Sequence, residues 1–208
     1  MTTTRRRLVA LAGLAGGVLL VVGLLGVATG WWLAADPSPG EGSVDVGFAR
    51  DMGVHHDQAV ELAELVRERT DDPTIVQVAK DIALTQQAQI GELRGWLDVW
   101  GRRPTSAGPP MQWMGHPADE PMPGLASDDE IAALTVGEGV EAEKLFLELM
   151  IRHHEGGIHM AEYAATEADE PFVRTLAHGM VEAQSLEIDQ MTDLLAERGV
   201  RYGDAEGP

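Results

Sequence analysis

Apolar residues recur with helical spacing through two separate stretches of the chain, residues 48–97 and 146–195. In each stretch they lie three and four positions apart on both sides of a break, which reads Asp71-Asp72-Pro73 in the first and Asp169-Glu170-Pro171 in the second. This spacing places an apolar stripe on each of two helices, and the proline favours the start of the second helix. Each stretch is therefore predicted to form a helical hairpin.

The two stretches are copies of one another. When they are aligned at a constant offset of 98 without a gap, 12 of the 50 positions are identical. The identities gather at the turn and around a Met-x-x-His-His motif, which begins at Met52 in the first copy and at Met150 in the second. Two such hairpins bury their stripes best against each other. The predicted fold is all-α, an antiparallel four-helix bundle made from two tandem hairpins.

The segments around the repeats are predicted from their turn and cap residues. Residues 101–126 are rich in Pro and Gly and are expected to form an irregular loop. The sequence Ser127-Asp128-Asp129-Glu130 is a capping box for a short helix, which Gly137 and Gly139 should interrupt, and Gly199 should end the last helix. The predicted bundle domain spans residues 45–199, with a linker at 36–44 and a tail at 200–208.

The N-terminal segment has a different character. Three arginines, Arg5 to Arg7, precede an uncharged apolar run from Leu8 to Ala34, 27 residues long. A helix of that length reaches roughly 40 Å, which exceeds the hydrocarbon core of about 30 Å. A signal peptide is the alternative, but its apolar region is usually only about 7–15 residues. Residues 1–35 are therefore predicted to be a cytoplasmic stub and a single transmembrane helix, with the bundle outside the cytoplasm.

Composition narrows the partners and the ligand chemistry. After the apolar run the chain carries 12 Lys and Arg against 34 Asp and Glu, a formal charge of −22, which argues against nucleic acid as a partner. The chain has no cysteine, so a soft metal ligand must be one of its nine methionines or seven histidines. The sequence leaves open a membrane protein partner or a second copy of the chain.

Polar residues interrupt the apolar stripe of every predicted helix. In an antiparallel hairpin, residues equally distant from the turn lie at the same height. The pair His55-His56 should therefore lie opposite residues 86–89, and the pair His153-His154 opposite residues 184–187. The sequence thus predicts one polar layer across the bundle.

Histidine and methionine side chains that converge in one layer favour a soft metal ion, with copper preferred over zinc or iron. The second copy has more of these side chains and is predicted to hold the tighter site. A purely structural layer is the alternative, because a buried His can be satisfied by Gln or Glu, and Met often fills a core. The candidate ligands in the bundle are Met52, His55, His56, Met150, His153, His154, His159, Met160, His178, Met180, Glu187 and Met191, and those in the loop are Met111, Met114, His116 and Met122.

Three segments resemble a known family, the bacterial domain of unknown function 305, which is described as ferritin-like. They begin at Phe48 (FARDMGVHHD), Met122 (MPGLASDDE) and Phe146 (FLELMIRHHEGG), and the resemblance extends from about Asp45 to Arg198. Some members of that family are periplasmic copper-binding proteins that use Met and His. The resemblance therefore implies copper handling, and the residues that match are Met52, His55, His56, Met150, His153 and His154.

Two other functions are compatible with the sequence. A ferritin-like di-metal oxidoreductase would need Glu on two helices and Glu-x-x-His on the other two, whereas this chain offers Gln86-x-x-Gln89 and Gln184-x-x-Glu187. The sequence therefore favours a role that is not enzymatic. An accessory protein of a membrane complex is the other candidate, and Trp96, Trp100 and Trp113 would then be contact residues.

Overall fold

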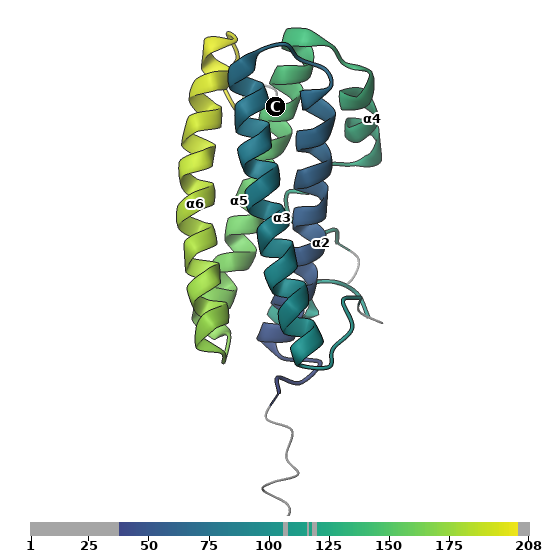
Figure 1. The fold of residues 1–208 in the computed structure, drawn as a ribbon, viewed down its shortest axis with the longest axis vertical. Helices are drawn as coiled ribbons and strands as arrows, with labels where there is room; N and C mark the ends of the chain where they lie inside the picture. The colour runs from purple at the N-terminus through teal and green to yellow at the C-terminus, as the bar shows by residue number, and fades with distance from the viewer. Residues whose placement is uncertain (1–37, 106–107, 116, 118–119, 204–208) are drawn as a thin grey trace, which may run out of the picture. The chain divides into compact units, whose positions relative to one another are not determined.

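Four long helices and one short one make up the helical part of the chain in the computed structural model, which describes residues 38–105, 108–115, 117 and 120–203. Figure 1 shows the four long helices side by side, with α4 beside the end of the bundle where the α2–α3 turn lies. The elements are α2 (Val44–Arg67), α3 (Pro73–Val99), the 3₁₀ helix η1 (Gln112–Met114), α4 (Asp128–Val136), α5 (Gly139–Glu167) and α6 (Pro171–Glu197). The predicted all-α fold of two hairpins is confirmed.

Local sequence signals account for where the helices begin and end. The Asp72 carboxylate accepts from the backbone N–H of Thr74 at 2.8 Å, and Pro73 is the first residue of α3. At α4, Ser127 and Glu130 form the predicted capping box. Gly199 has a φ of 78°, the left-handed conformation that ends a helix at low cost for glycine. Among the described residues of the predicted irregular loop, only η1 is helical.

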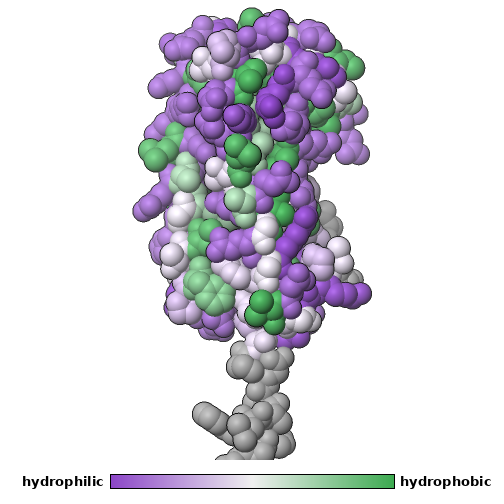
Figure 2. Space-filling model, in the orientation of Figure 1, coloured by the Kyte–Doolittle hydropathy of each residue, from purple (hydrophilic) through white to green (hydrophobic). Residues whose placement is uncertain are grey.

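The predicted transmembrane segment, residues 8–34, lies outside the described residues. Within the described part of the chain, none of the helices is both long enough and apolar enough to cross a membrane. Figure 2 shows a bundle face that is mainly hydrophilic, with apolar residues scattered among the polar ones. Single exposed apolar residues are ordinary on protein surfaces.

Two buried carboxylates tie each hairpin turn to the other hairpin. Asp45, at the start of α2, accepts the backbone N–H groups of Asp169 and Glu170 at 3.2 and 2.8 Å. Glu143 occupies the equivalent position in the second copy, since 45 and 143 differ by the same offset of 98, and it accepts from the Thr70 hydroxyl in the first turn. The internal symmetry therefore extends to the contacts between the hairpins.

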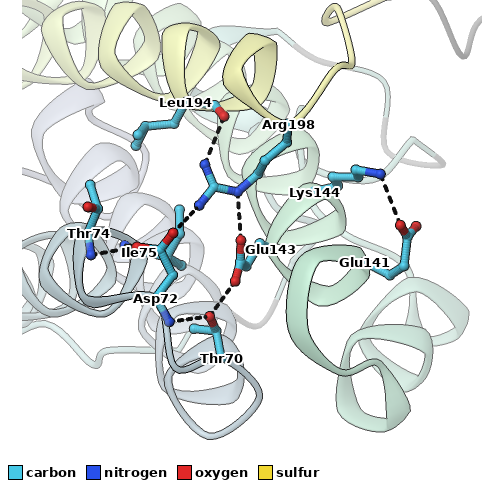
Figure 3. Close-up of polar contacts among 9 residues, drawn as sticks. All are labelled: Thr70, Asp72, Thr74, Ile75, Glu141, Glu143, Lys144, Leu194 and Arg198. Carbon is cyan, nitrogen blue, oxygen red and sulfur yellow. Dashed lines mark hydrogen bonds and ion pairs between the residues drawn. The ribbon is translucent and has the colours of Figure 1, made fainter.

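Arg198 completes the network at the α2–α3 turn. Figure 3 shows its guanidinium between Glu143 and Asp72, with Nε 2.7 Å from a Glu143 oxygen and Nη2 2.8 Å from an Asp72 oxygen. Its Nη1 also donates to the carbonyl of Leu194 at 2.9 Å. One cation thus joins the end of α6 to the starts of α3 and α5.

The apolar interior consists of two clusters of buried residues, which we call the upper and lower cores from their places in Figure 1. The upper core lies toward the α2–α3 turn and includes Leu62, Ile82, Phe146, Met150 and Met191. The lower core lies toward the α5–α6 turn and includes Phe48, Met52, Leu93, Met160 and Met180.

Candidate metal centre

A buried polar layer lies between the upper and lower cores. Along α2, Met52 belongs to the lower core and Ala59 to the upper core, and the first His pair lies between them. The other three long helices change from one core to the other in the same way. The polar layer consists of His55, His56, Gln86, His153, His154 and Gln184, each of which is at most 3% exposed.

The predicted pairing within each hairpin is confirmed. His56 Nε2 lies 2.8 Å from Gln89 Oε1, and His154 Nε2 lies 2.7 Å from Glu187 Oε2. Residues 89 and 187 are equivalent positions of the repeat. Each hairpin therefore places its second histidine against a polar side chain of its partner helix.

The first histidines of the two motifs meet at the centre of the layer. The ring centroids of His55 and His153 are 3.8 Å apart, and His153 Nε2 donates to the backbone carbonyl of His55 at 2.9 Å. This contact joins α2 to α5 and therefore joins the two copies. The single layer across the bundle is as the sequence predicts, and the direct contact between the two first histidines is what the structure adds.

The hydrogen bonds of these imidazoles define which ring nitrogen carries the proton. His55 Nε2 lies 3.0 Å from the carbonyl oxygen of Pro123, and a carbonyl can only accept. His153 likewise donates to a carbonyl, while His56 and His154 have an amide oxygen and a carboxylate as partners. In the neutral ring, a proton on Nε2 leaves a lone pair on Nδ1. All four Nδ1 atoms are buried and have no hydrogen-bond partner.

Burial keeps three of these imidazoles, those of His55, His56 and His153, in their neutral form at neutral pH. Desolvation lowers the pKa of His55 to about 4, and desolvation together with the neighbouring His55 lowers the pKa of His56 to about 3. The pKa of His153 lies well below its ordinary value for the same reasons. Neutral imidazole is the form that binds metal ions.

The two glutamines of the layer are also short of partners. Neither side-chain polar atom of Gln86 has a hydrogen-bond partner, and Oε1 of Gln184 has none. An unsatisfied buried polar group costs about 1–3 kcal/mol, and folded proteins leave few of them. Seven such atoms in one layer, four of them imidazole nitrogens, therefore fit a ligand that accepts nitrogen lone pairs.

The donor set restricts the kind of ion that fits. In the described part of the chain, no three His, Asp or Glu side chains are arranged to hold one metal ion together. The layer therefore fits an ion that is satisfied by two imidazoles or by imidazole with thioether or amide donors, as a soft ion is. It does not fit a centre built from several carboxylates.

A short strap, residues 122–126, covers the layer on one side. Its Pro123 carbonyl holds His55, and the backbone of Ala126 pairs with the side-chain amide of Gln58 at 2.7 and 2.9 Å. A Cβ atom at Gly156 would collide with the Pro123 carbonyl. Glycine at that position therefore lets the strap approach α5 beside the second His pair.

The adjacent glycine, Gly157, makes room for a side chain inside the layer. A Cβ atom at Gly157 would lie 2.6 Å from Oε1 of Gln184, closer than side chains pack. The pair Gly156-Gly157 thus makes room for the strap on one side and for a layer glutamine on the other. In the sequence these two glycines stand out only as the end of the family-like segment that begins at Phe146. No sequence signal predicts the strap contacts of Pro123 and Gln58.

The predicted methionine ligands lie in the two cores on either side of the layer. Met150 and Met191 are buried in the upper core. Met114 is partly buried against the lower core, so the loop methionines join those of the bundle. The methionines buried in the lower core are Met52, Met111, Met122, Met160 and Met180.

The remaining predicted ligands are placed differently. His159 and His178 are exposed on α5 and α6 and do not belong to the buried layer. Glu187 is partly exposed and contacts the layer through His154. His116 lies outside the described residues. The structure therefore brings the four motif histidines together and leaves the two extra histidines of the second copy at the surface.

Comparison with known proteins places this geometry in a family. Residues 45–195 match the family model described as domain of unknown function (DUF305). A crystal structure of a DUF305 protein from Streptomyces coelicolor is 48% identical, with a TM-score of 0.76, and the match covers 79% of this chain and 99% of that one.

Two further similarities are informative. CopM in its Cu(II)-bound form is 27% identical with a TM-score of 0.60, and its Cu(I)-bound form is 25% identical with a TM-score of 0.56; each match covers 74% of this chain and 96% of CopM. A segment of 54 residues is 37% identical to uncharacterized protein L153 of Acanthamoeba polyphaga mimivirus, and it spans 26% of this chain and 36% of that protein. The chain thus spans only about a third of the curated relative it matches.

Proposed function

Since this chain belongs to the family described as domain of unknown function DUF305, and since it is similar to copper-bound CopM, we propose that it binds copper through histidine and methionine side chains in the cell envelope. The observation that carries the proposal is the set of four buried Nδ1 atoms without partners. Each imidazole already donates through Nε2 to an acceptor that orients the ring. Such an outer hydrogen bond is the usual companion of a metal-bound histidine.

The proposed residues have separate roles. His55, His56, His153 and His154 supply Nδ1 donors, and Pro123, Gln89 and Glu187 orient three of those rings. Methionines on either side of the layer supply thioethers for a soft ion. Binding is favoured over oxidase chemistry, because a di-iron centre needs several core carboxylates and Glu187 alone touches this layer among the described residues.

The full-length chain, kept in detergent because of its apolar run, should bind Cu(I) more tightly than Zn(II) or Fe(II). Thioether donors favour the soft ion, whereas imidazole alone discriminates little among these metals. Competition with a chelator of known affinity measures the order. Equal retention of Zn(II) would instead indicate a site made from histidine and carboxylate, and no retention of copper would refute the proposed function.

We also propose that residues 1–35 anchor the protein in the membrane with the bundle outside the cytoplasm, because arginines precede the apolar run. Protease added to intact cells should then degrade the bundle and spare a cytoplasmic marker protein. A bundle that resists protease until the cells are permeabilised would contradict this orientation. Release of the bundle into the medium would show that the apolar run is cleaved rather than retained.

A further inference from the structure

The polar layer is composed almost entirely of neutral groups. Its six members are imidazoles and amides, and Gln89, which contacts His56, is also an amide. In the part of the chain that the structure describes, Glu187 is the only carboxylate within hydrogen-bonding or ion-pair distance of a layer histidine. With every histidine counted as neutral, the layer and its direct contacts carry a formal charge of −1.

Neighbouring carboxylates are directed elsewhere. Asp51 accepts the backbone N–H of Met111 and the indole N–H of Trp113. Asp57 is half exposed and forms an ion pair with Arg94 at 2.7 Å. Glu155, which follows His154, is exposed and accepts from a tyrosine hydroxyl. These carboxylates are thus held by hydrogen bonds, by an arginine or by solvent away from the layer, whereas the Glu187 carboxylate, with its side chain 25% exposed, contacts a fully buried imidazole.

The two copies of the repeat differ in charge at only one of the four compared positions of the layer and its contacts. Residues 55 and 153, 56 and 154, and 86 and 184 are identical pairs, whereas the fourth pair is Gln89 and Glu187. The two side chains make equivalent hydrogen bonds to Nε2, at 2.8 and 2.7 Å. Gln and Glu therefore orient their histidines alike and differ in charge alone.

Charge compensation matters most where water is excluded. An ion buried without a counter-charge loses hydration that neutral ligands replace only in part, and the loss grows with the charge of the ion. A layer of formal charge −1 compensates a monovalent cation fully and leaves a divalent cation with one uncompensated charge. The fourth pair can therefore set which ion the layer accepts.

Building on the proposed copper function, we propose that Glu187 and Gln89 select the charge of the bound ion, so that the layer takes a monovalent soft ion, Cu(I) or Ag(I), in preference to a divalent one. Glu187 acts as a counter-charge through His154. Gln89 keeps the opposite half of the layer neutral. A second carboxylate at position 89 would match a divalent ion instead.

Charge-swap variants of the full-length chain test this inference, with Cu(I) and Zn(II) affinities measured by chelator competition. E187Q keeps an oxygen acceptor for His154 and removes the charge, so Cu(I) affinity should fall at least about tenfold. Q89E adds a second charge and should raise Zn(II) affinity relative to Cu(I) by at least about tenfold. The double variant E187Q/Q89E moves the single charge to the other half, so its Cu(I) affinity should recover to within about threefold of the wild type.

Glu182→Gln is the matched control, because Glu182 is an exposed carboxylate on α6 and its loss should leave both affinities unchanged. A wild type that binds Cu(I) together with an unaffected E187Q would overturn the inference and leave the proposed function intact. A double variant that fails to recover would also overturn it, since Glu187 would then act by position and not by charge. A wild type that binds neither metal would refute the proposed function itself.

Discussion

Replacing His55 and His56 with alanine should lower the Cu(I) affinity of the chain at least about tenfold, which corresponds to 1.4 kcal/mol, and replacing His153 and His154 should lower it by a similar amount. The reason is that the two pairs form one layer, in which the His55 and His153 rings are 3.8 Å apart. Each double variant removes half of the unpartnered Nδ1 donors. Chelator competition measures the affinities, and circular dichroism verifies that helical content is retained.

Exposed histidines of the same protein provide the control. The variant in which His159 and His178 become alanine loses as many imidazoles, but both lie on the surface outside the layer, so its affinity should equal that of the wild type. If Cu(I) affinity fell more for the His153 and His154 variant than for the His55 and His56 variant, and also fell in this control, the sequence-based hypothesis of a tighter site in the second copy would be supported instead. No loss in either motif variant would show that the paired histidines are structural.

The repeat predicts which residues of each hairpin face one another in the layer, but it does not predict the contact between the two hairpins. Counting from each turn correctly placed His56 opposite Gln89 and His154 opposite Glu187, because both pairs lie within one antiparallel hairpin. No such count relates α2 to α5, since a long loop and a short helix separate them. The contact between the tilted His55 and His153 rings depends on how the hairpins pack against each other, which periodicity does not define.

The polar contacts between the hairpins were missed for a different reason. Asp45 and Glu143 each lie three residues before the aligned segment of their own copy. A carboxylate near the start of a helix ordinarily indicates a favourable interaction with that helix's own N-terminus. In the structure they are buried and bind the turn of the other hairpin. An acidic residue with the same repeat offset in both copies was the available signal.

The loop was predicted by composition alone, and its role came from packing. Proline and glycine correctly indicated an irregular segment, yet composition could not show that Pro123 accepts from His55. Gly156 and Gly157 carry the complementary signal, since two glycines inside a helix cost stability unless another group approaches closely. Only the second copy has this pair, which agrees with a strap that covers one side of the layer.

Replacing Arg198 with methionine should reduce the free energy of unfolding by about 3 kcal/mol, the lower end of the usual cost of removing one partner of a buried ion pair. The Arg198 and Glu143 side chains are only 9% and 6% exposed, so the variant leaves Glu143 buried without its cation. Adding Glu143→Gln removes that charge and keeps an acceptor for Thr70, and the double variant should therefore regain part of the loss. Urea denaturation of the full-length chain followed by circular dichroism measures each change.

The matched control breaks an ion pair at the surface. Arg94 and Asp57 form a pair at the same 2.7 Å, but their side chains are 54% and 48% exposed, so Arg94→Met should change the free energy of unfolding by less than about 1 kcal/mol. Because the Arg198 network lies at the α2–α3 turn and the histidines lie between the two cores, Arg198→Met should weaken the fold without changing Cu(I) affinity under conditions where the chain is folded. Equal losses for Arg198→Met and Arg94→Met would show that solvent screens the Glu143 charge, and the network would then not be what holds the hairpins together.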